Sequence, residues 1–417
     1  MKDYISFKIL NYSGKFNTKI FFNNNLGKNP FIYQNELYIP KDILRDEYQS
    51  NFGMEQKVDD KKSPNNKNNQ IDNSLYLQKP TGLINYGASV CYMNALLQCF
   101  YYCYPMTQYF LNLDDYQINR LGLVSKSYYN FVKYLNSGNE YAAKEFKDAL
   151  IYTDSSFAGT EGKDSKDLAF FILTELHEEL KENENSLMVL NQNTNHYNKY
   201  EVYKEKIDLM NINRNNTIIS DTFDYLIISE HKCNNIRCQG IYSKNFYNIQ
   251  NQNIIVFELE TIYKSINKSN KKQISLNDCL NIYFKNDILN CPFCKTNKLE
   301  KKKAICSLPN IFIFVMNRGK YAKFDCKINF TKEIDLKDYY IPMEENFYGN
   351  KTKYNLICAT LVYDWNKGYS HGGHTIAFCK TFKNNQYYIF NDSTAKPYDI
   401  NKIYNETPYL LFYEKIK

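Results

Sequence analysis

Apolar residues recur at helical spacing in two segments of the first half of the chain. In 91–110 and in 167–180 they fall three and four positions apart, which places them on one face of a helix. The residues that define these faces are Leu96, Leu97, Phe100 and Tyr101 in the first segment and Leu168, Phe171, Ile172 and Leu176 in the second. Both segments are therefore predicted to be helices with one face buried in a core.

From residue 218 onward the pattern changes to short apolar runs bounded by polar and turn-forming residues. Runs of this length, rich in Ile, Val, Phe and Tyr, are typical of β-strands. The predicted strands are 254–257, 311–315, 356–363, 374–378, 387–390 and 410–413. Helices that come first and strands that come later predict an α+β fold.

Polar stretches divide the chain into regions. Residues 1–54 hold strand-like pieces separated by turns, which predicts a small β-rich accessory region. Residues 55–78 are charged, rich in Asn and nearly free of apolar side chains, which predicts a linker. The main domain is expected to span 79–416, with polar loop insertions at 191–206 and 264–272.

Composition and charge argue against a nucleic-acid-binding protein and against a membrane protein. The 417 residues are 43% hydrophobic, enough for a substantial core, and their net charge of +7 is not gathered into long basic runs. We therefore expect no nucleic-acid partner. No apolar stretch reaches the roughly 18–20 residues that span a bilayer, so we expect no membrane association. The N-terminus lacks the apolar segment of a signal peptide, so we expect a cytoplasmic and/or nuclear location.

The 12 cysteines are predicted to be reduced, because a chain without an export signal rarely carries a dense disulfide framework. Their expected uses are a thiol nucleophile, metal ligation and core packing. The cysteines assigned to core packing are Cys99, Cys103, Cys279, Cys306, Cys326, Cys358 and Cys379.

Two close pairs of cysteines have the spacing of metal ligands. Cys291 and Cys294 form a C-x2-C pair, a strong half-site for zinc, and Cys233 and Cys238 form a wider C-x4-C pair about sixty residues earlier. Four thiolates leave no coordination position for a water, so the predicted zinc is structural, and no cofactor is expected for catalysis. The alternative is a metal-free region with reduced thiols.

One cysteine stands at the start of the first predicted helix. The stretch 82–98 reads GLINYGASVCYMNALLQ, in which small residues lead into Cys91. The thiolate is the nucleophilic form of cysteine, and a free thiol with a pKa of about 8.5 is only slightly ionised at neutral pH. The positive end of a helix dipole and a paired imidazole both stabilise a thiolate. Cys91 is therefore a candidate nucleophile.

A histidine and an asparagine later in the chain are candidate partners for this thiol. Of the five histidines, His374 opens a predicted strand directly after Gly372 and Gly373, which let a loop turn tightly beside the site. The next predicted strand leads into Asn391 and Asp392, and an imidazole base needs such a partner to fix its tautomer. An Asn-Asp pair after a strand is also common in turns.

Taken together, these segments resemble the ubiquitin-specific proteases. The stretch around Cys91 is similar to that family's motif G-L-x-N-x-G-x-T-C-Y-x-N-x-x-L-Q. The stretches around His374 and Asn391 are similar to the family's G-G-H-Y-x-A and W-Y-x-F-[ND]-D. Further similarities follow in the family's order and extend the resemblance to about residues 80–414.

The resemblance implies a fold with three parts. It predicts a papain-like α+β protease with a helical thumb at about 79–205, zinc-bearing β fingers at about 206–300 and a β-rich palm at about 301–416. The two cysteine pairs match the place where the family's fingers carry zinc.

The resemblance also implies a role for each catalytic candidate. Cys91 would be the nucleophile, His374 the base, Asn391 the third triad member, Asp392 a supporting carboxylate and Asn85 the oxyanion donor. In the family this Asn precedes the cysteine by five positions, whereas here it precedes it by six. If the turn cannot bulge to absorb the extra residue, Asn85 is a turn residue and backbone N–H groups form the oxyanion hole.

Residues that would bind the substrate follow from the same resemblance. Asp164 and Asp167 match acidic positions that grip the arginines of the ubiquitin tail, and acids also suit the first turn of a helix. His371, Gly372 and Gly373 match the loop that covers this tail, although an exposed loop histidine needs no ligand.

The implied activity is that of a deubiquitinating thiol hydrolase, a ubiquitinyl hydrolase. It would cleave the bond after the C-terminal Gly of ubiquitin through a thioester on Cys91, with ubiquitin or ubiquitinated proteins as partners, and is expected to act as a monomer. Two alternatives stay open. One is a ubiquitin-binding scaffold whose oxyanion hole is disabled by the extra residue, and the other is a protease for a different ubiquitin-like modifier.

Overall fold

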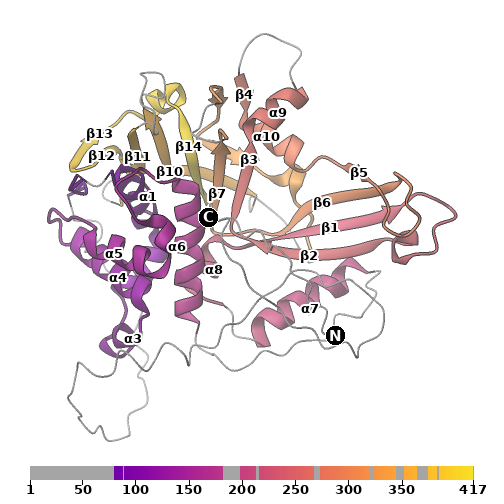
Figure 1. Ribbon diagram of the computed structural model, residues 1–417, viewed down its shortest axis with the longest axis horizontal. Coiled ribbons are helices and arrows are strands. Elements are labelled where there is room, and N and C mark those ends of the chain that lie inside the picture. Colours follow the sequence, from indigo (N-terminus) through magenta and orange to yellow (C-terminus); the bar gives the residue numbers. More distant parts are fainter. Residues whose placement is uncertain are drawn as a thin grey trace, which may run out of the picture. The chain divides into compact units, whose positions relative to one another are not determined.

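The computed structural model describes most of the chain from residue 79 onward (Figure 1). The described ranges are 79–87, 89–181, 198–212, 216–266, 273–319, 324–343, 352–363, 374–382 and 385–416. The accessory region predicted at 1–54 and the linker predicted at 55–78 lie outside these ranges, so both remain predictions.

The thumb is a group of helices that lie between residues 91 and 223. They are α1 (Cys91–Tyr101), α2 (Tyr104–Leu111), α3 (Asp115–Asn119), α4 (Leu123–Asn136), α5 (Lys144–Thr153), α6 (Ser165–Leu180) and α8 (Ile218–Phe223). Helix α6 confirms the helix predicted over 167–180. It begins at Ser165 because the side chain of Asp164 accepts a hydrogen bond from the backbone N–H of Lys166.

The single helix predicted over 91–110 is wrong, because this segment forms two helices. Helix α1 ends at Tyr101 and α2 begins at Tyr104. Pro105 lies in the first turn of α2, where its missing N–H has no intrahelical partner to lose. In the interior of one continuous helix the same proline would remove a hydrogen bond and clash with the preceding turn. The proline therefore limits the length of the helix that begins at Cys91.

The palm is a large sheet, and it contains all six strands predicted from the sequence. Its strands are β3 (Ile254–Glu258), β7 (Ile311–Asn317), β9 (Glu333–Asp335), β10 (Lys353–Tyr363), β11 (His374–Lys380), β12 (Tyr387–Asn391), β13 (Thr394–Pro397) and β14 (Pro408–Lys415). The order is β13-β12-β11-β10-β14-β7-β3, with β9 paired to β10. Only the β3–β7 pair in this sheet is parallel among the described residues. The α+β prediction is confirmed.

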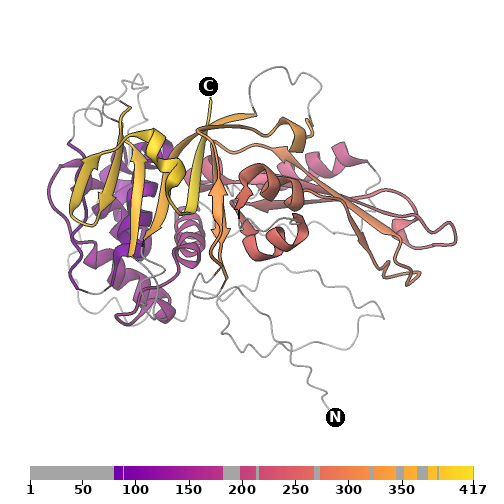
Figure 2. The ribbon, with the colours of Figure 1, turned by 90° about the horizontal axis from the view of Figure 1, so that it is seen from above.

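Alternate residues of the palm strands face two separate cores. Phe412 packs against the thumb helices, whereas its neighbours Leu411 and Tyr413 pack on the opposite face with α9 (Leu259–Ile266) and α10 (Leu276–Tyr283). Figure 2 shows the sheet between these two groups of helices. Because both faces are covered, the central strands are almost entirely apolar in sequence.

The fingers are a second, four-stranded sheet that extends away from the palm (Figure 1). Its strands are β1 (Tyr225–Cys233), β2 (Phe246–Gln252), β5 (Asp287–Leu289) and β6 (Leu299–Ser307), in the order β2-β1-β6-β5. The range 206–300 also contains β3, α9 and α10, which pack on the palm. The range that the sequence assigned to the fingers therefore contributes both to the fingers sheet and to the palm.

Two segments predicted as loops are partly helical. Helix α7 (Lys199–Ile212) begins inside 191–206, and α9 continues to Ile266, inside 264–272. Val202 explains the first difference, because it packs against the fingers with Leu226 and Ile228. Strand β4 (Gln273–Ser275) pairs with β8 (Lys327–Asn329) in a small parallel sheet of its own. No helix in the described ranges is both long enough and apolar enough to cross a membrane.

Candidate active site

Cys91 is the first residue of α1, and its position depends on the turn that precedes it. Gly87 has φ 85° and Ser89 has φ 48°, so the backbone takes two left-handed steps just before the helix. This is where the extra residue relative to the related motif falls, and the left-handed steps are how the turn accommodates it. Val90 is fully buried and no side chain caps the helix. The unpaired backbone N–H groups of the first turn therefore lie beside the half-buried thiol.

His374 and Asn391 come together because they lie on neighbouring strands. His374 is the first residue of β11, Asn391 is the last residue of β12, and these two strands are antiparallel. The Nε2 atom of His374 lies 2.6 Å from Oδ1 of Asn391. Because Oδ1 can only accept, Nε2 must carry the proton, and Nδ1 is the ring nitrogen left for Cys91.

The electrostatic environment favours the protonated form of His374. A hydrogen bond with Cys91 is the main cause that raises its pKa to about 9, partial burial opposes the shift, and the bond with Asn391 and the charge of Asp392 add to it. At neutral pH the ring is therefore predominantly an imidazolium. An imidazolium in contact with a thiol nucleophile favours the thiolate–imidazolium pair that cysteine hydrolases use. The three residues predicted as nucleophile, base and orienting residue thus lie in one hydrogen-bonded row.

Asp392 binds two amides instead of the histidine. Its Oδ2 accepts from Nδ2 of Asn85 at 3.1 Å, and its Oδ1 accepts from Nδ2 of Asn94 at 2.9 Å. Asp392 has φ 46°, a left-handed conformation that Asp tolerates better than most residues. The carboxylate therefore connects the end of β12 to the residues on both sides of Cys91, and it acts on His374 only through its charge.

Backbone contacts also join the end of β12 to the residues that precede Cys91. The N–H of Leu83 donates to the carbonyl oxygen of Asp392 at 2.8 Å. A Cβ added to Gly82 would lie 2.2 Å from that oxygen and 2.4 Å from the carbonyl carbon of Ser393. Only glycine allows the two backbones to approach this closely.

Asn85 is placed where an oxyanion donor is useful. One N–H of its amide donates to Asp392, and its Oδ1 accepts from the backbone N–H of Gly87 at 3.3 Å. These bonds fix the amide plane and leave a second N–H that can donate. Asn94 is the second Asn of the stretch 82–98 and has no predicted role, and its hydrogen bond with Asp392 shows that it helps to position this carboxylate.

A buried lysine behind the nucleophile, Lys147, has a role that no sequence pattern indicated. Its Nζ donates to the hydroxyl of Tyr92 at 3.0 Å and to the carbonyl oxygen of Phe157 at 2.7 Å. Burial lowers the pKa of Lys147. The ammonium thus connects α5 to the residue next to Cys91. A lysine in the middle of an amphipathic pattern is normally exposed, so only the fold reveals this contact.

The predicted substrate-binding residues divide into three groups. Asp164 is the N-cap of α6, and its Oδ1 also accepts from the hydroxyl of Tyr409 at 2.6 Å. Burial raises the pKa of Asp164. Asp167 is more exposed and pairs with Nζ of Lys166 at 2.5 Å. His371, Gly372 and Gly373 lie outside the described residues.

The four cysteines predicted to bind metal converge at the tip of the fingers. The Sγ atoms of Cys233 and Cys294 are 3.6 Å apart, and those of Cys238 and Cys291 are 3.8 Å apart. All four Sγ atoms lie within 4.8 Å of one another. Four sulfurs at the roughly 2.3 Å bond length of zinc would be about 3.8 Å apart at the corners of a tetrahedron, so the donor set fits this ion.

The loop between Cys291 and Cys294 is shaped by the backbone. The N–H of Lys295 donates to the carbonyl oxygen of Cys291 at 2.9 Å, and Lys295 has φ 58°. This tight turn directs both thiols to one point, which is what a C-x2-C pair needs to bind a metal. The cluster could hold a metal ion.

Comparison with known proteins gives a consistent result. Residues 81–413 match the protein family described as ubiquitin carboxyl-terminal hydrolase. The chain is 25% identical over 378 residues to ubiquitin carboxyl-terminal hydrolase 2 of Bos taurus, across 82% of this chain and 56% of that protein. It is also 25% identical over 375 residues to the human protein of the same name, across 82% and 56%. The chain thus spans just over half the length of these curated relatives.

Solved structures agree at the level of the fold. The SAGA DUB module of Ubp8, Sgf11, Sus1 and Sgf73 bound to monoubiquitin contains a chain with a TM-score of 0.59 and 20% identity, covering 81% of this chain and 69% of that chain. The same module bound to ubiquitin aldehyde gives a TM-score of 0.58 and 21% identity, covering 83% and 71%.

Proposed function

The chain belongs to the ubiquitin carboxyl-terminal hydrolase family, and from this premise we propose that it is a cysteine deubiquitinase. It hydrolyses the peptide or isopeptide bond after the C-terminal Gly of ubiquitin. The observation that carries the proposal is the row formed by Cys91, His374 and Asn391, in which each residue is hydrogen-bonded to the next. The names of the relatives and the ubiquitin bound in the similar structures support ubiquitin as the substrate.

The first half of the reaction follows from the proton positions in this row. The Cys91 thiolate attacks the carbonyl carbon of the terminal Gly, and the carbonyl electrons move onto its oxygen. The tetrahedral intermediate then collapses, the bond to the leaving amine breaks, and Nδ1–H of His374 gives its proton to that amine. Asn391 holds the ring by accepting from Nε2–H, so the proton leaves from the nitrogen that faces the thiol.

The second half returns the site to its starting state. The product of the first half is a thioester between Cys91 and the terminal Gly. His374, now neutral, removes a proton from a water, and the resulting hydroxide equivalent attacks the thioester. The C–S bond breaks, the thiolate–imidazolium pair is restored, and free ubiquitin leaves with a carboxyl group that loses its proton to solvent.

The developing oxyanion is stabilised by two sources. The first is the N-terminal turn of α1, whose unpaired N–H groups and helix dipole lie at the nucleophile. The second is the amide of Asn85, which Asp392 holds by one N–H so that the other can donate. The left-handed steps at Gly87 and Ser89 are the reason that an extra residue before Cys91 is compatible with an active enzyme.

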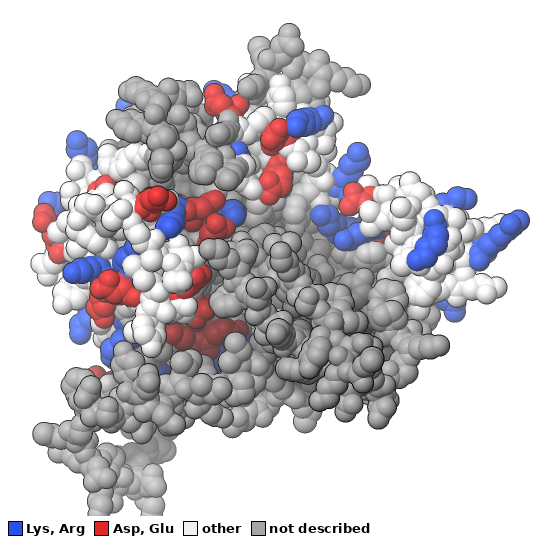
Figure 3. Space-filling view, viewed as in Figure 1, with Lys and Arg blue, Asp and Glu red and all other residues white. Residues whose placement is uncertain are grey.

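Recognition of the substrate tail depends on charge and on a narrow path. On the face in Figure 3, acidic side chains gather over the thumb, interspersed with basic ones, while the fingers carry mostly Lys and Arg. The ubiquitin tail ends Leu-Arg-Leu-Arg-Gly-Gly, so its arginines are attracted to the thumb. Asp167 is the exposed acid for this contact, whereas Asp164 positions α6. The His371–Gly373 segment is proposed to cover the Gly-Gly end.

Zinc is proposed as a structural ion in the fingers. Cys233, Cys238, Cys291 and Cys294 would hold it with four thiolates, which leaves no open position for catalysis. The ion would cross-link the ends of the finger strands, where the apolar core around these cysteines is small. All catalytic steps belong to side chains and backbone of the chain itself.

The decisive test is hydrolysis of ubiquitin that carries a C-terminal fluorogenic amide, with wild type beside Cys91→Ala and His374→Ala. We expect cleavage by wild type and a loss of at least several hundred-fold in both variants, with ubiquitin binding retained by Cys91→Ala. Binding without cleavage by wild type would support the scaffold alternative. Cleavage of the same amide on another ubiquitin-like modifier, with none on ubiquitin, would support the second alternative.

A further inference from the structure

A lysine of the same chain is paired with the acid that is proposed to bind the arginines of the substrate tail. Lys166 lies in the first turn of α6, between Asp164 and Asp167. Its Nζ lies 2.5 Å from Oδ1 of Asp167, and only 14% of its side chain is exposed, against 48% for Asp167. In the free protein, the exposed acid of the tail site is therefore already occupied by a cation.

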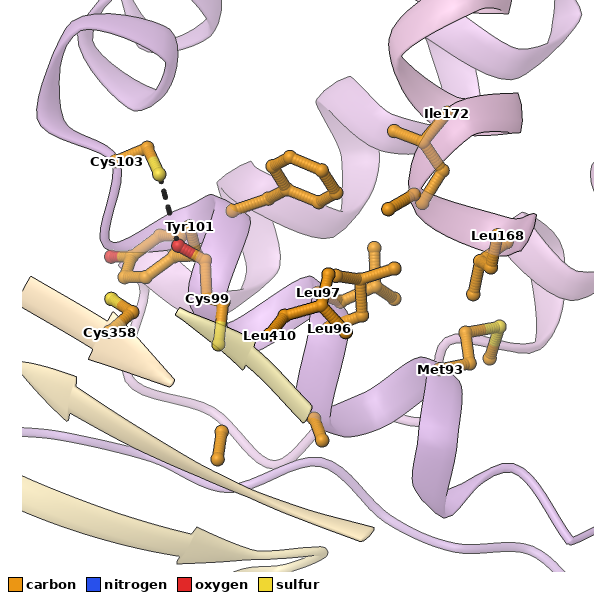
Figure 4. Close-up of a cluster of buried hydrophobic side chains, with 14 of the residues drawn as sticks. Met93, Leu96, Leu97, Cys99, Tyr101, Cys103, Leu168, Ile172, Cys358 and Leu410 are labelled. Carbon is orange, nitrogen blue, oxygen red and sulfur yellow. Dashed lines mark hydrogen bonds between the residues drawn. The ribbon is translucent and has the colours of Figure 1, made fainter. Parts of the chain in front are cut away.

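The position of this ion pair is fixed by the way α6 begins and packs. The side chain of Asp164 accepts from the backbone N–H of Lys166 at 2.8 Å, which caps the helix. Figure 4 shows Leu168 and Ile172 of α6 directed toward the core that contains α1, and both residues are fully buried. The first turn of α6 is thus anchored to the core, and Lys166 and Asp167 with it.

A third acid belongs to the same group but comes from the palm. Glu258 ends β3, and Nδ2 of Asn317 on β7 donates to both of its carboxylate oxygens, at 2.8 Å and 2.9 Å. The two residues are direct partners in the parallel β3–β7 pair. The register of the sheet therefore holds the carboxylate of Glu258 in place.

The charges of these acids act on Lys166. Burial lowers the pKa of Lys166, and its hydrogen bond with Asp167 opposes this effect. The charges of Asp164, Asp167 and Glu258 also raise this pKa, which lies above its ordinary value. A lysine in the first turn opposes the helix dipole, which favours acids at this end. The formation of α6 therefore does not require a cation at this position.

We propose that Lys166 is a specificity-determining residue that occupies the place of a substrate arginine in the free enzyme. Its ammonium lies on the carboxylate that a tail arginine would bind, so the two cations compete for Asp167. The inference rests on the proposed function, because it takes the ubiquitin tail as the substrate segment that meets α6. Binding of a basic tail must then release Lys166 from Asp167 to solvent.

The exchange is possible because the two cations differ. An arginine forms two parallel hydrogen bonds to a carboxylate, whereas a lysine is a point charge on a flexible stem and is strongly hydrated when released. The acids outnumber Lys166, so the site still attracts a basic tail. Lys166 reduces the gain from that attraction, and it has no such effect on a tail without arginines. It therefore narrows the preference for ubiquitin over modifiers with less basic tails.

The experiment measures the binding of ubiquitin to the full chain with Cys91→Ala, by isothermal titration calorimetry at low ionic strength, where charges are least screened. Lys166→Gln removes the charge, and Lys166→Met takes the place of this variant if it does not retain its helical content. Lys181→Gln is the matched control, because Lys181 pairs with Glu178 at 2.5 Å at the other end of α6. We expect Kd to fall by about 2- to 5-fold in the Lys166 variant, the range of a surface ion pair, and to stay unchanged in the control.

Ubiquitin with a changed tail locates the effect. Each of its two tail arginines is replaced by alanine in turn, and Kd is measured again with and without Lys166→Gln. The gain should disappear with at least one of these two ubiquitins, because its tail no longer competes for Asp167. In the enzyme with Cys91 intact, Lys166→Gln should lower KM for the fluorogenic amide and leave kcat unchanged.

Three results would overturn the proposal. They are an unchanged or higher Kd in the Lys166 variant, an equal gain in the Lys181 variant, and a gain that persists with both changed ubiquitins. Binding and cleavage of ubiquitin without the gain would refute this inference alone. A chain that neither binds nor cleaves ubiquitin would refute the proposed function, and this inference with it.

Discussion

The bond between His374 and Asn391 can be removed without disturbing the core. Asn391 is exposed at the end of β12, and its side chain accepts from Nε2 of His374 at 2.6 Å. In Asn391→Ala the ring loses the partner that fixes its tautomer and orientation. A hydrogen bond from a charged donor is worth about 1.5–3 kcal/mol, and the partial exposure of His374 favours the lower end, about 1.5–2 kcal/mol. At 1.36 kcal/mol per tenfold, kcat/KM should fall by about 10- to 30-fold.

The pH profile gives a second readout that a purely structural role would not change. The thiolate–imidazolium pair is lost when His374 deprotonates, so the alkaline limb of kcat/KM reports its pKa, which lies at about 9. Asn391 contributes to raising this pKa, so Asn391→Ala should move the alkaline limb to lower pH.

Asn391→Asp is the matched control, because it keeps an acceptor at the same place and adds a negative charge. Most of the activity should remain, and the alkaline limb should move to higher pH. The assay is hydrolysis of the C-terminal fluorogenic amide of ubiquitin, measured from about pH 5 to about pH 10 so that the range includes the pKa of His374. A change of less than about 3-fold in kcat/KM for Asn391→Ala, with an unmoved alkaline limb, would refute the role of this residue.

Three further predictions concern the contact between Gly82 and Asp392, the cysteine cluster of the fingers, and His177. Gly82→Ala puts a Cβ 2.2 Å from the carbonyl oxygen of Asp392, so we expect a lower unfolding midpoint and a loss of activity, measured by calorimetry and amide hydrolysis. Cys291→Ser, or removal of metal by a chelator, should destabilise the fingers, which limited proteolysis and zinc analysis would detect, and should weaken the binding of ubiquitin. Burial lowers the pKa of His177 to about 4, below its unfolded value of 6.5, so its contribution to stability is complete above pH 6.5 and is lost as the pH falls toward 4. Unfolding in urea across this range should show the loss, by up to about 3 kcal/mol, and His177→Gln should reduce the dependence on pH.

Local sequence patterns determined much of the architecture. The six predicted strands and the helix at 167–180 are present, because apolar periodicity and turn residues act within a few positions of each other. The helix that begins at Cys91 was also predicted, but its length was not, since the effect of Pro105 was missed. A proline this close to the middle of 91–110 is a local signal for the end of a helix.

Other errors came from contacts that no local pattern contains. The polar segment after residue 198 reads as a loop, yet it forms α7 because Val202 finds an apolar surface on the fingers. Lys147 is an ordinary surface residue by type, and it is buried because α5 brings it to Tyr92 and Phe157. Packing between distant segments decided that α7 is helical and that Lys147 is buried, because such packing outweighs weak local propensities.

The candidate site shows the same division. The sequence offered Cys91 and His374 as candidate nucleophile and base, and the resemblance to the ubiquitin-specific proteases added Asn391 as the third member. The structure places the His374 ring against Asn391 and in contact with Cys91. The sequence could not say that Asp392 holds Asn85 and Asn94, since these residues are about 300 positions apart and meet only where β12 ends beside α1. The reactive side chains of the site are visible as residue types in the sequence. The distances between them depend on how the whole chain packs, so only the folded structure gives them.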